Sequence, residues 1–180
     1  MQGVRERDLN TGRLRVHLRE SGSGIPVVLL HGNCASSLFF EELLAALPEG
    51  FWGIAPDLRG YGETEPLPVD GSRGSGDWSD DLDALAETLG LDRFHLLGWS
   101  MGGGIAMHYA LTRSARLHSL TLMAPTSPYG VAATKGADGV PCYDDFAGGG
   151  GGIINPEFAK RIAEGDRGSD SPFSPRNTMN

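Results

Sequence analysis

The pentad Gly98-Trp99-Ser100-Met101-Gly102 joins an apolar run to a stretch of helical character, and it constrains the fold more than any other part of the chain. The run at residues 94–97 predicts a buried strand, and residues 105–111 carry the predicted helix beyond the turn. At such a corner a serine adopts unfavourable backbone angles that expose its hydroxyl, and flanking glycines avoid clashes with neighbouring backbone. The pentad therefore predicts Ser100 as a nucleophile, with Gly98 and Gly102 as its structural glycines.

Strands and helices alternate along most of the chain. Apolar or alternating runs predict strands at residues 13–19, 25–30, 51–55, 94–97 and 118–123. Helical spacing predicts helices at residues 39–47, with Ser36 or Ser37 as N-cap, at 77–90, and after the pentad. This order predicts an α/β fold, a mostly parallel sheet with helices on both faces, in which 25–30 is a central strand.

Two groups of polar side chains are expected to face solvent. His17 falls on the polar side of the alternating run at residues 13–19. Four acids, Asp77, Asp80, Asp81 and Asp83, fall near the start of the predicted helix at 77–90, on its solvated side. We expect no metal site among them.

Chemistry-bearing residues follow the ends of the predicted strands, where ligands bind in parallel sheets. Acyl transfer needs two N–H donors aimed at the developing oxyanion, one from the residue after the nucleophile and one from a neighbouring strand-end loop. Met101 follows Ser100, and Asn33 lies in the loop after residues 25–30. Their backbone amides are the predicted oxyanion hole, and Trp99 is a candidate substrate-binding residue.

Three motifs together resemble the N-terminal half of the α/β-hydrolase fold family: His31-Gly32-Asn33, Asp57-Leu58-Arg59-Gly60-Tyr61-Gly62 and the serine pentad, in that order. The resemblance covers residues 4–125. It implies Ser100 as nucleophile, Asn33 and Met101 as oxyanion hole, and residues 57–62 as a structural loop beside the site. A serine argues against the haloalkane dehalogenase and epoxide hydrolase branches, where the nucleophile is aspartate, although His31-Gly32-Asn33 resembles the dehalogenase loop.

The family order places an acid and a histidine after later strands, and no histidine of this chain follows Ser100 in such a loop. The resemblance implies that residues 1–125 are the N-terminal part of an incomplete hydrolase core and that 126–180 begin a helical cap or lid. This region is expected to be partly flexible, with a linker at the glycine run 148–152 and a short helix at 156–164. We expect a fragment, inactive alone, completed by a C-terminal segment or a separate chain.

Composition narrows the class of partner. The net charge of −8, from 15 basic and 23 acidic residues, repels nucleic acid and anionic membranes. Cys34 and Cys142 form neither a CxxC pair nor a ligand cluster, so reduced thiols are expected. No long apolar run or leader is found, and we expect a cytoplasmic protein that binds a small ester or acyl substrate without metal or organic cofactor.

Three functions remain open on these residues. The first is a serine hydrolase of carboxylic esters or related acyl substrates, with the triad acid and histidine missing from this chain. The second is a carbon–carbon bond hydrolase, lactonase or perhydrolase on the same elbow. The third is a non-catalytic module that keeps the fold to bind a ligand.

Overall fold

The computed structural model describes residues 3–127, 134–135, 140–141 and 155–178. The chain divides into two compact units, Met1–Gly130 and Val131–Asn180, and each is described by itself. In chain order, the elements of the first unit are β1 (Arg5–Asn10), β2 (Arg15–Gly22), β3 (Ile25–Leu30), η1 (Ser37–Phe40), α1 (Glu41–Ala46), β4 (Phe51–Pro56), η2 (Gly71–Arg73), α2 (Gly76–Thr88), β5 (Phe94–Trp99), α3 (Met101–Arg113), η3 (Ser114–Arg116) and β6 (Leu117–Met123).

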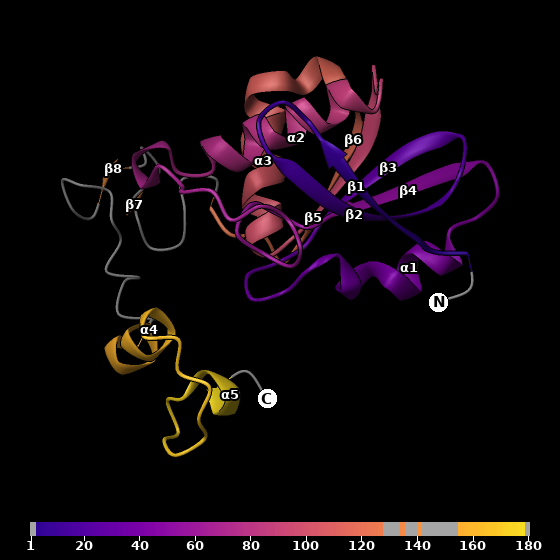
Figure 1. The fold of residues 1–180 in the computed structure, drawn as a ribbon. Helices are drawn as coiled ribbons and strands as arrows, with labels where there is room; N and C mark the ends of the chain where they lie inside the picture. Colours follow the sequence, from indigo (N-terminus) through magenta and orange to yellow (C-terminus); the bar gives the residue numbers. More distant parts are fainter. Residues whose placement is uncertain (1–2, 128–133, 136–139, 142–154, 179–180) are drawn as a thin grey trace. The chain divides into compact units, whose positions relative to one another are not determined.

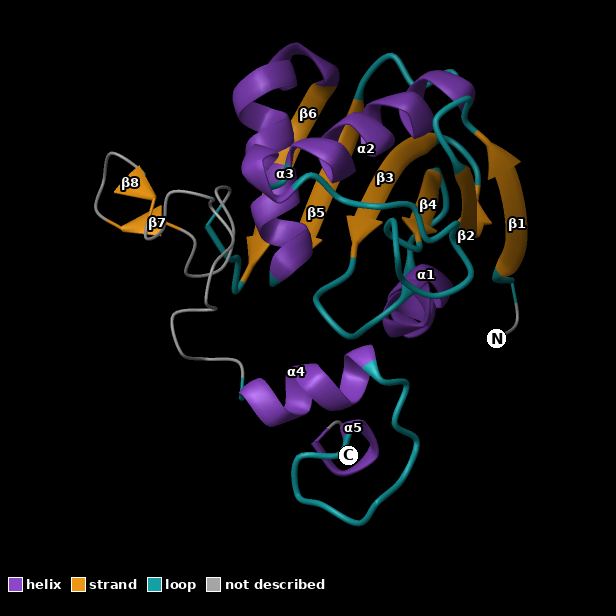
Figure 2. Ribbon diagram, turned by 60° about the vertical axis from the view of Figure 1, so that its left-hand side comes forward, coloured by secondary structure: helices purple, strands orange, loops and turns teal. Residues whose placement is uncertain are grey.

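The six strands of the first unit form one sheet in the order β1-β2-β4-β3-β5-β6. Strands β4, β3, β5 and β6 run parallel, whereas β2 pairs antiparallel with both β1 and β4. The predicted mostly parallel sheet is confirmed, with β3 between β4 and β5 (Figure 2). Because the parallel strands end at Leu30, Pro56, Trp99 and Met123, the residues that follow them share one edge of the sheet.

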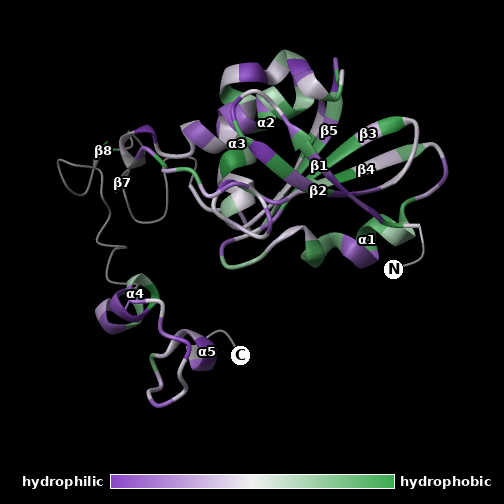
Figure 3. Cartoon of the chain, in the orientation of Figure 1, coloured by the Kyte–Doolittle hydropathy of each residue, from purple (hydrophilic) through white to green (hydrophobic). Residues whose placement is uncertain are grey.

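Helices cover both faces of this sheet, as predicted (Figure 1). On one face, α2 and α3 bury side chains such as Leu82, Leu85 and Ile105 against the apolar strands. On the other face, Phe40 and Leu44 from η1 and α1 pack on Leu29 and other strand residues. Figure 3 shows β3 as a largely hydrophobic ribbon, which is expected of a strand covered from both sides.

The first two strands differ from the sequence expectation. Residues 5–10 form strand β1, which the pattern did not predict, and β2 is buried along Val16–Ser21 rather than half exposed. The expectation of a solvated His17 is wrong, because its side chain is buried with Nδ1 2.9 Å from Asp8 Oδ1 on β1. Pairing with acids on the neighbouring strand makes it possible to bury a polar face.

The acids of α2 also differ from expectation. Asp77 and Asp81 are buried, and Asp80 and Asp83 are half-buried, so the predicted solvated placement is wrong. Each of the four forms an ion pair with at least one arginine; Asp81 accepts from Arg59 at 2.7 and 2.8 Å. Arginine partners, some near in sequence such as Arg73 and some distant such as Arg113, neutralise these carboxylates, so the acids can lie against the protein.

The predicted helix at 39–47 is split into two short elements. Ser36 is the N-cap of η1, where its side chain accepts from the Leu38 amide, and α1 follows directly. Phe40 and Leu44 are buried, while Phe39 remains 49% exposed. The exposed ring lies beside the strand-end edge of the sheet, where it contacts Trp99.

The described elements of the second unit are β7 (Thr134–Lys135), β8 (Val140–Pro141), α4 (Pro156–Ala163) and α5 (Pro175–Thr178). Helix α4 confirms the predicted helix; Asn155 caps it and Pro156 occupies its first turn. The glycine run 148–152 and Cys142 lie outside the described residues. Among the described helices, none combines the length and hydropathy of a membrane-spanning segment.

Candidate active site

Ser100 occupies the corner between β5 and α3, and its backbone lies in a region that side chains rarely adopt. Its φ is 54° and its ψ is −116°. The Ser100 amide donates to the Met123 carbonyl at 3.0 Å, and the Ser100 carbonyl accepts from the Thr126 and Gly103 amides at 2.9 and 3.0 Å. These bonds hold a strained residue in place, which is the geometry expected where strain serves a site.

The glycines on either side of Ser100 are required by close backbone contacts. A Cβ atom at Gly98 would lie 2.3 Å from the Gly102 carbonyl oxygen, and one at Gly102 would lie 2.3 Å from the Leu30 carbonyl oxygen. Both separations are far below van der Waals contact. The pattern of glycines two before and two after the serine therefore reflects packing of α3 on β3 and β5.

The loop after β3 lies directly against this corner. Its first residue, His31, is fully buried, with Nε2 accepting from the Leu58 amide at 3.0 Å and Nδ1 2.8 Å from the Gly32 carbonyl oxygen. This pairing fixes the neutral ring with its proton on Nδ1, and burial lowers the pKa of His31. A Cβ at Gly32 would lie 3.0 Å from Ser100 Cβ, so the loop backbone adjoins the serine.

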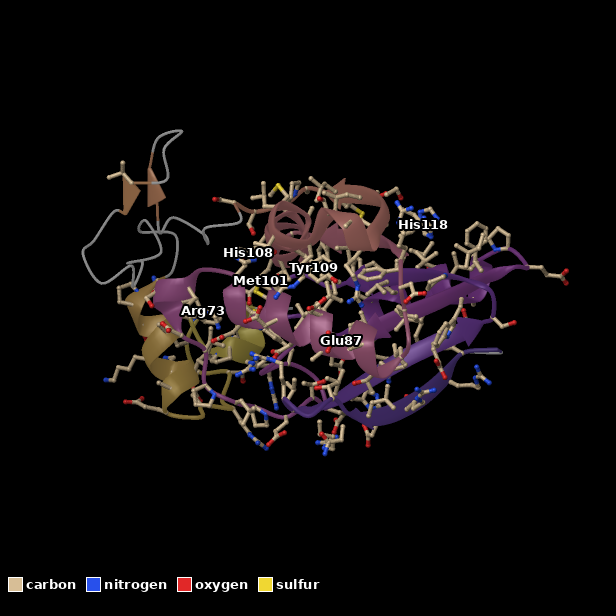
Figure 4. The ribbon with its side chains drawn as sticks, turned by 90° about the horizontal axis from the view of Figure 1, so that it is seen from above. Arg73, Glu87, Met101, His108, Tyr109 and His118 are labelled. Carbon is tan, nitrogen blue, oxygen red and sulfur yellow. The ribbon has the colours of Figure 1, made fainter. Side chains whose placement is uncertain are left out.

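Asn33 and Met101, the two predicted oxyanion residues, come together at the hydroxyl of Tyr61. Asn33 is exposed, and its Oδ1 accepts from the Tyr61 hydroxyl at 2.6 Å. The Met101 sulfur lies 3.5 Å from the same hydroxyl oxygen. Figure 4 labels Met101 on α3, together with His108 and Tyr109 on the same helix. The side chains of the two residues thus converge on one group.

Asp57 connects the neighbouring loops from a buried position. Its Oδ1 accepts from the Ser37 amide at 2.6 Å, and its Oδ2 accepts from the Glu63 amide at 2.9 Å. Both carboxylate oxygens are therefore used in backbone contacts. This arrangement supports the structural role that the sequence resemblance implied for residues 57–62.

Trp99 lies beside the serine in a stack with Phe39. The two rings are 3.9 Å apart between centroids and 9° from parallel. Trp99 is half-buried, and the exposed part of Phe39 extends the apolar surface next to the corner. Sequence reasoning missed Phe39 because its spacing indicated a core position; a pair of adjacent phenylalanines on one short helix was the available signal.

Among the described residues, no side chain forms a hydrogen bond with the Ser100 hydroxyl. The His31 ring is hydrogen-bonded to the backbone of Leu58 and Gly32, and His95 Nδ1 lies 2.7 Å from Ser119 Oγ. His108 lies along α3, and burial lowers its pKa. The described part of the chain also holds no group of three or more histidine, cysteine or acidic residues arranged for a metal ion.

Comparison with known proteins places these features in a family. The model of the alpha/beta hydrolase fold matches residues 25–139. A similar curated protein is the 2-hydroxymuconate semialdehyde hydrolase of Pseudomonas sp. (strain CF600), 29% identical over 157 residues that cover 86% of this chain and 51% of the relative.

Two similar solved structures are hydrolases. An epoxide hydrolase from Vigna radiata matches with a TM-score of 0.64 at 27% identity, covering 68% of this chain and 38% of that one. A serine hydrolase from Cycloclasticus zankles matches with a TM-score of 0.65 at 27% identity, covering 74% and 48%. The chain thus spans about half or less of the length of these proteins. Its strand order, its serine corner and the family match together show that the chain belongs to the alpha/beta hydrolase fold family.

Proposed function

We propose that this chain carries the nucleophile and oxyanion hole of a serine hydrolase acting on carboxylic esters or related acyl substrates. The observation that carries the proposal is Ser100, held at a φ of 54° between β5 and α3 with its hydroxyl unpaired among the described residues. The elbow residue is serine rather than the aspartate of the dehalogenase and epoxide hydrolase branches. The likeness to the Cycloclasticus serine hydrolase supports the same choice.

In this mechanism the Ser100 hydroxyl oxygen attacks the carbonyl carbon of the substrate and gives up its proton to a base. The carbonyl oxygen becomes an oxyanion that accepts hydrogen bonds from the Asn33 and Met101 amides. One such donor lowers the barrier by about 3 to 4 kcal/mol in a well-studied protease. Collapse of the tetrahedral intermediate expels the alcohol, and water then releases the acid from the acyl-enzyme.

The base and its orienting acid come from the C-terminal part of the fold in this proposal. The described histidines have other partners or positions, and the chain spans 51% of the curated relative described above. Strand β6 pairs only with β5 among the described strands, which leaves an edge where further strands can add. We call these 180 residues together with that part the complete protein, whether that part lies in the same polypeptide or in a separate chain.

A fluorophosphonate probe tests this proposal because it reacts with activated serines. We expect labelling of Ser100 in the complete protein, loss of labelling in Ser100→Ala, and retention in Ser114→Ala, which changes an exposed serine on η3. The 180-residue chain alone is expected to label far more slowly. If the complete, folded protein does not react with the probe, the result contradicts the proposal and favours a non-catalytic ligand-binding module.

A carbon–carbon bond hydrolase is the second candidate. The observation that favours it is the similarity to the 2-hydroxymuconate semialdehyde hydrolase, which covers 86% of this chain. Both candidates use Ser100, so labelling does not separate them. The two candidates are separated by comparing kcat/KM for p-nitrophenyl acetate with kcat/KM for 2-hydroxymuconate semialdehyde. The better substrate identifies the protein as an ester hydrolase or as a carbon–carbon bond hydrolase.

A further inference from the structure

Tyr61 contacts the side chains of both residues assigned to the oxyanion hole. Its hydroxyl is 2.6 Å from Asn33 Oδ1 and 3.5 Å from the Met101 sulfur. A phenol has one proton to donate, and a carbonyl oxygen is a much better acceptor than a thioether sulfur. The hydrogen bond therefore goes to Asn33, and the Met101 side chain packs against the hydroxyl oxygen.

Tyr61 is itself held firmly. Its amide donates to the Leu58 carbonyl at 2.9 Å, and its carbonyl accepts from the Thr64 amide at 3.2 Å. Its ring meets the His31 ring edge to face, with centroids 5.4 Å apart and planes at 74°. Burial raises the pKa of Tyr61, so the hydroxyl keeps its proton at neutral pH. The loop is thus a fixed support from which the hydroxyl reaches the site.

Asn33 needs such support. It is exposed at the end of β3, and Cys34, which follows it, has a φ of 54°. Its side-chain oxygen has one hydrogen bond, the one from Tyr61, among the described residues. Met101 opens helix α3 from the other side of the site. The two predicted donors thus stand on separate elements, and the Tyr61 hydroxyl contacts the side chains of both residues.

We propose that Tyr61 is a positioning residue for the oxyanion hole. It fixes the side chain of Asn33 against that of Met101 and so sets the spacing of the two backbone amides. This inference rests on the proposed serine-hydrolase function. Tyr61 acts through Asn33 and Met101 and makes no contact with substrate, so its effect falls on transition-state stabilisation rather than on substrate binding.

Tyr61→Phe removes the hydroxyl and keeps the ring on His31. In the complete protein we expect kcat for p-nitrophenyl acetate to fall about tenfold, the equivalent of one hydrogen bond, with KM changed less than about twofold. Fluorophosphonate labelling should slow by a similar factor. The matched control is Tyr109→Phe, which removes a buried hydroxyl that donates to Asp83 at 2.8 Å on α2, and it should leave both rates unchanged.

Asn33→Ala provides a second route to the same interaction, because it removes the acceptor and leaves the backbone amide in place. If the Tyr61–Asn33 bond carries the effect, the double variant loses little more than either single one. Asn33→Ala also covers the case in which Tyr61→Phe does not fold.

Four results decide the proposal. A fall in kcat with constant KM and coupled losses in the double variant support it. Unchanged kinetics in both single variants, with active wild type, overturn it and leave the serine-hydrolase function standing. A rise in KM alone overturns it in favour of substrate binding by Tyr61. Absence of Ser100 labelling in the wild type overturns the proposed function and this inference together.

Discussion

At the scale of single residues, the site combines backbone strain at Ser100 with rigid supporting contacts around it. Ser100 is held by hydrogen bonds to the Met123 carbonyl and from the Thr126 amide, both of which come from β6 and the residues after it. A φ of 54° for a serine costs about 1 to 3 kcal/mol, and only surrounding structure can maintain it. The corner therefore depends on β6 as much as on its own glycines.

His31 makes the stability of this region depend on pH. Its burial lowers the pKa below the ordinary value of 6.5, so the unfolded chain binds a proton before the folded one does. Above pH 6.5 both states are neutral and His31 adds no pH dependence. As the pH falls through 6.5 toward the folded-state pKa, the free energy of unfolding decreases.

We expect urea unfolding between pH 7.5 and 5 to show this loss of unfolding free energy. In His31→Gln the slope of the unfolding free energy against pH should be shallower, by an amount that corresponds to at most one bound proton. Gln removes the titrating group while keeping a polar side chain near Leu58 and Gly32. Identical slopes in the two proteins would contradict the assignment. The comparison is restricted to pH above 5 because carboxylates titrate below it.

The sequence identified the residues at strand ends but not the contacts between them. Ser100, with the glycines around it, is found from local pattern, because a strand, a turn and a helix are consecutive there. Tyr61 and Phe39 were missed, since their importance comes from contacts with Asn33 and Trp99 across the sheet edge. The available signal for Tyr61 was an aromatic hydroxyl in a strand-end loop, and for Phe39 it was a pair of adjacent phenylalanines on one short helix. The roles of Ser100, Asn33, Met101 and Trp99 stay predictions.

At the scale of elements, the loop of residues 57–62 is anchored to helix α2. The Arg59 guanidinium pairs with Asp81 at 2.7 and 2.8 Å, and both side chains are less than 10% exposed. Arg13 also reaches Asp81, at 2.9 Å, and the Trp78 ring N–H donates to the Arg59 carbonyl at 3.1 Å. These contacts place the loop that carries Tyr61.

Asp81→Asn should therefore cost about 3 kcal/mol of unfolding free energy, because it leaves the Arg59 charge buried without its counter-ion. The matched control is Asp80→Asn on the same helix. Asp80 pairs with Arg73 and Arg113 at 2.7 Å each, but these groups are 23 to 45% exposed, so solvent screens them and the expected cost is under about 1 kcal/mol.

Chemical denaturation measures the unfolding free energy of Asp81→Asn and of Asp80→Asn. Equal losses would show that the ion pair of Asp81 is no more important to stability than an exposed one. A larger loss in Asp81→Asn would also predict slower labelling of Ser100 by the fluorophosphonate, since the loop that holds Tyr61 would be loosened.

Element boundaries and burial were harder to predict than element order. The charged pattern of residues 5–10 hid strand β1, because its side chains pair with Arg19 and Glu20 across the sheet instead of forming an apolar face. The acids of α2 were placed in solvent for the same reason. Periodicity reports hydrophobicity, so it does not detect a face that is buried through ion pairs with residues far away in sequence.

At the scale of the whole first unit, the alternation of strands and helices determined the architecture. Parallel strands need crossover connections, and α1, α2 and α3 supply them, which is why the mostly parallel sheet and the two helical layers followed from the pattern. The position of the serine at the carboxyl edge followed as well. The sheet also has an apolar strand at one of its edges.

Strand β6 is that edge. It pairs with β5 on one side, and among the described strands nothing pairs with its other side. Leu120, Leu122 and Met123 are 36 to 39% exposed on it. An exposed apolar edge strand can pair with another chain, so we expect the 180-residue chain alone to self-associate as its concentration rises.

Two leucine substitutions distinguish pairing at the strand edge from non-specific association through exposed apolar surface. Leu122→Lys places a charge on β6, whereas Leu111→Lys makes the same chemical change on α3, where the leucine is 71% exposed. If the strand edge drives association, light scattering should fall in Leu122→Lys and stay near wild type in Leu111→Lys, even though the second removes the more exposed leucine. Equal reductions would instead assign association to exposed apolar area. Thermal melts of both variants establish that each remains folded, so a change in scattering reports on the edge itself.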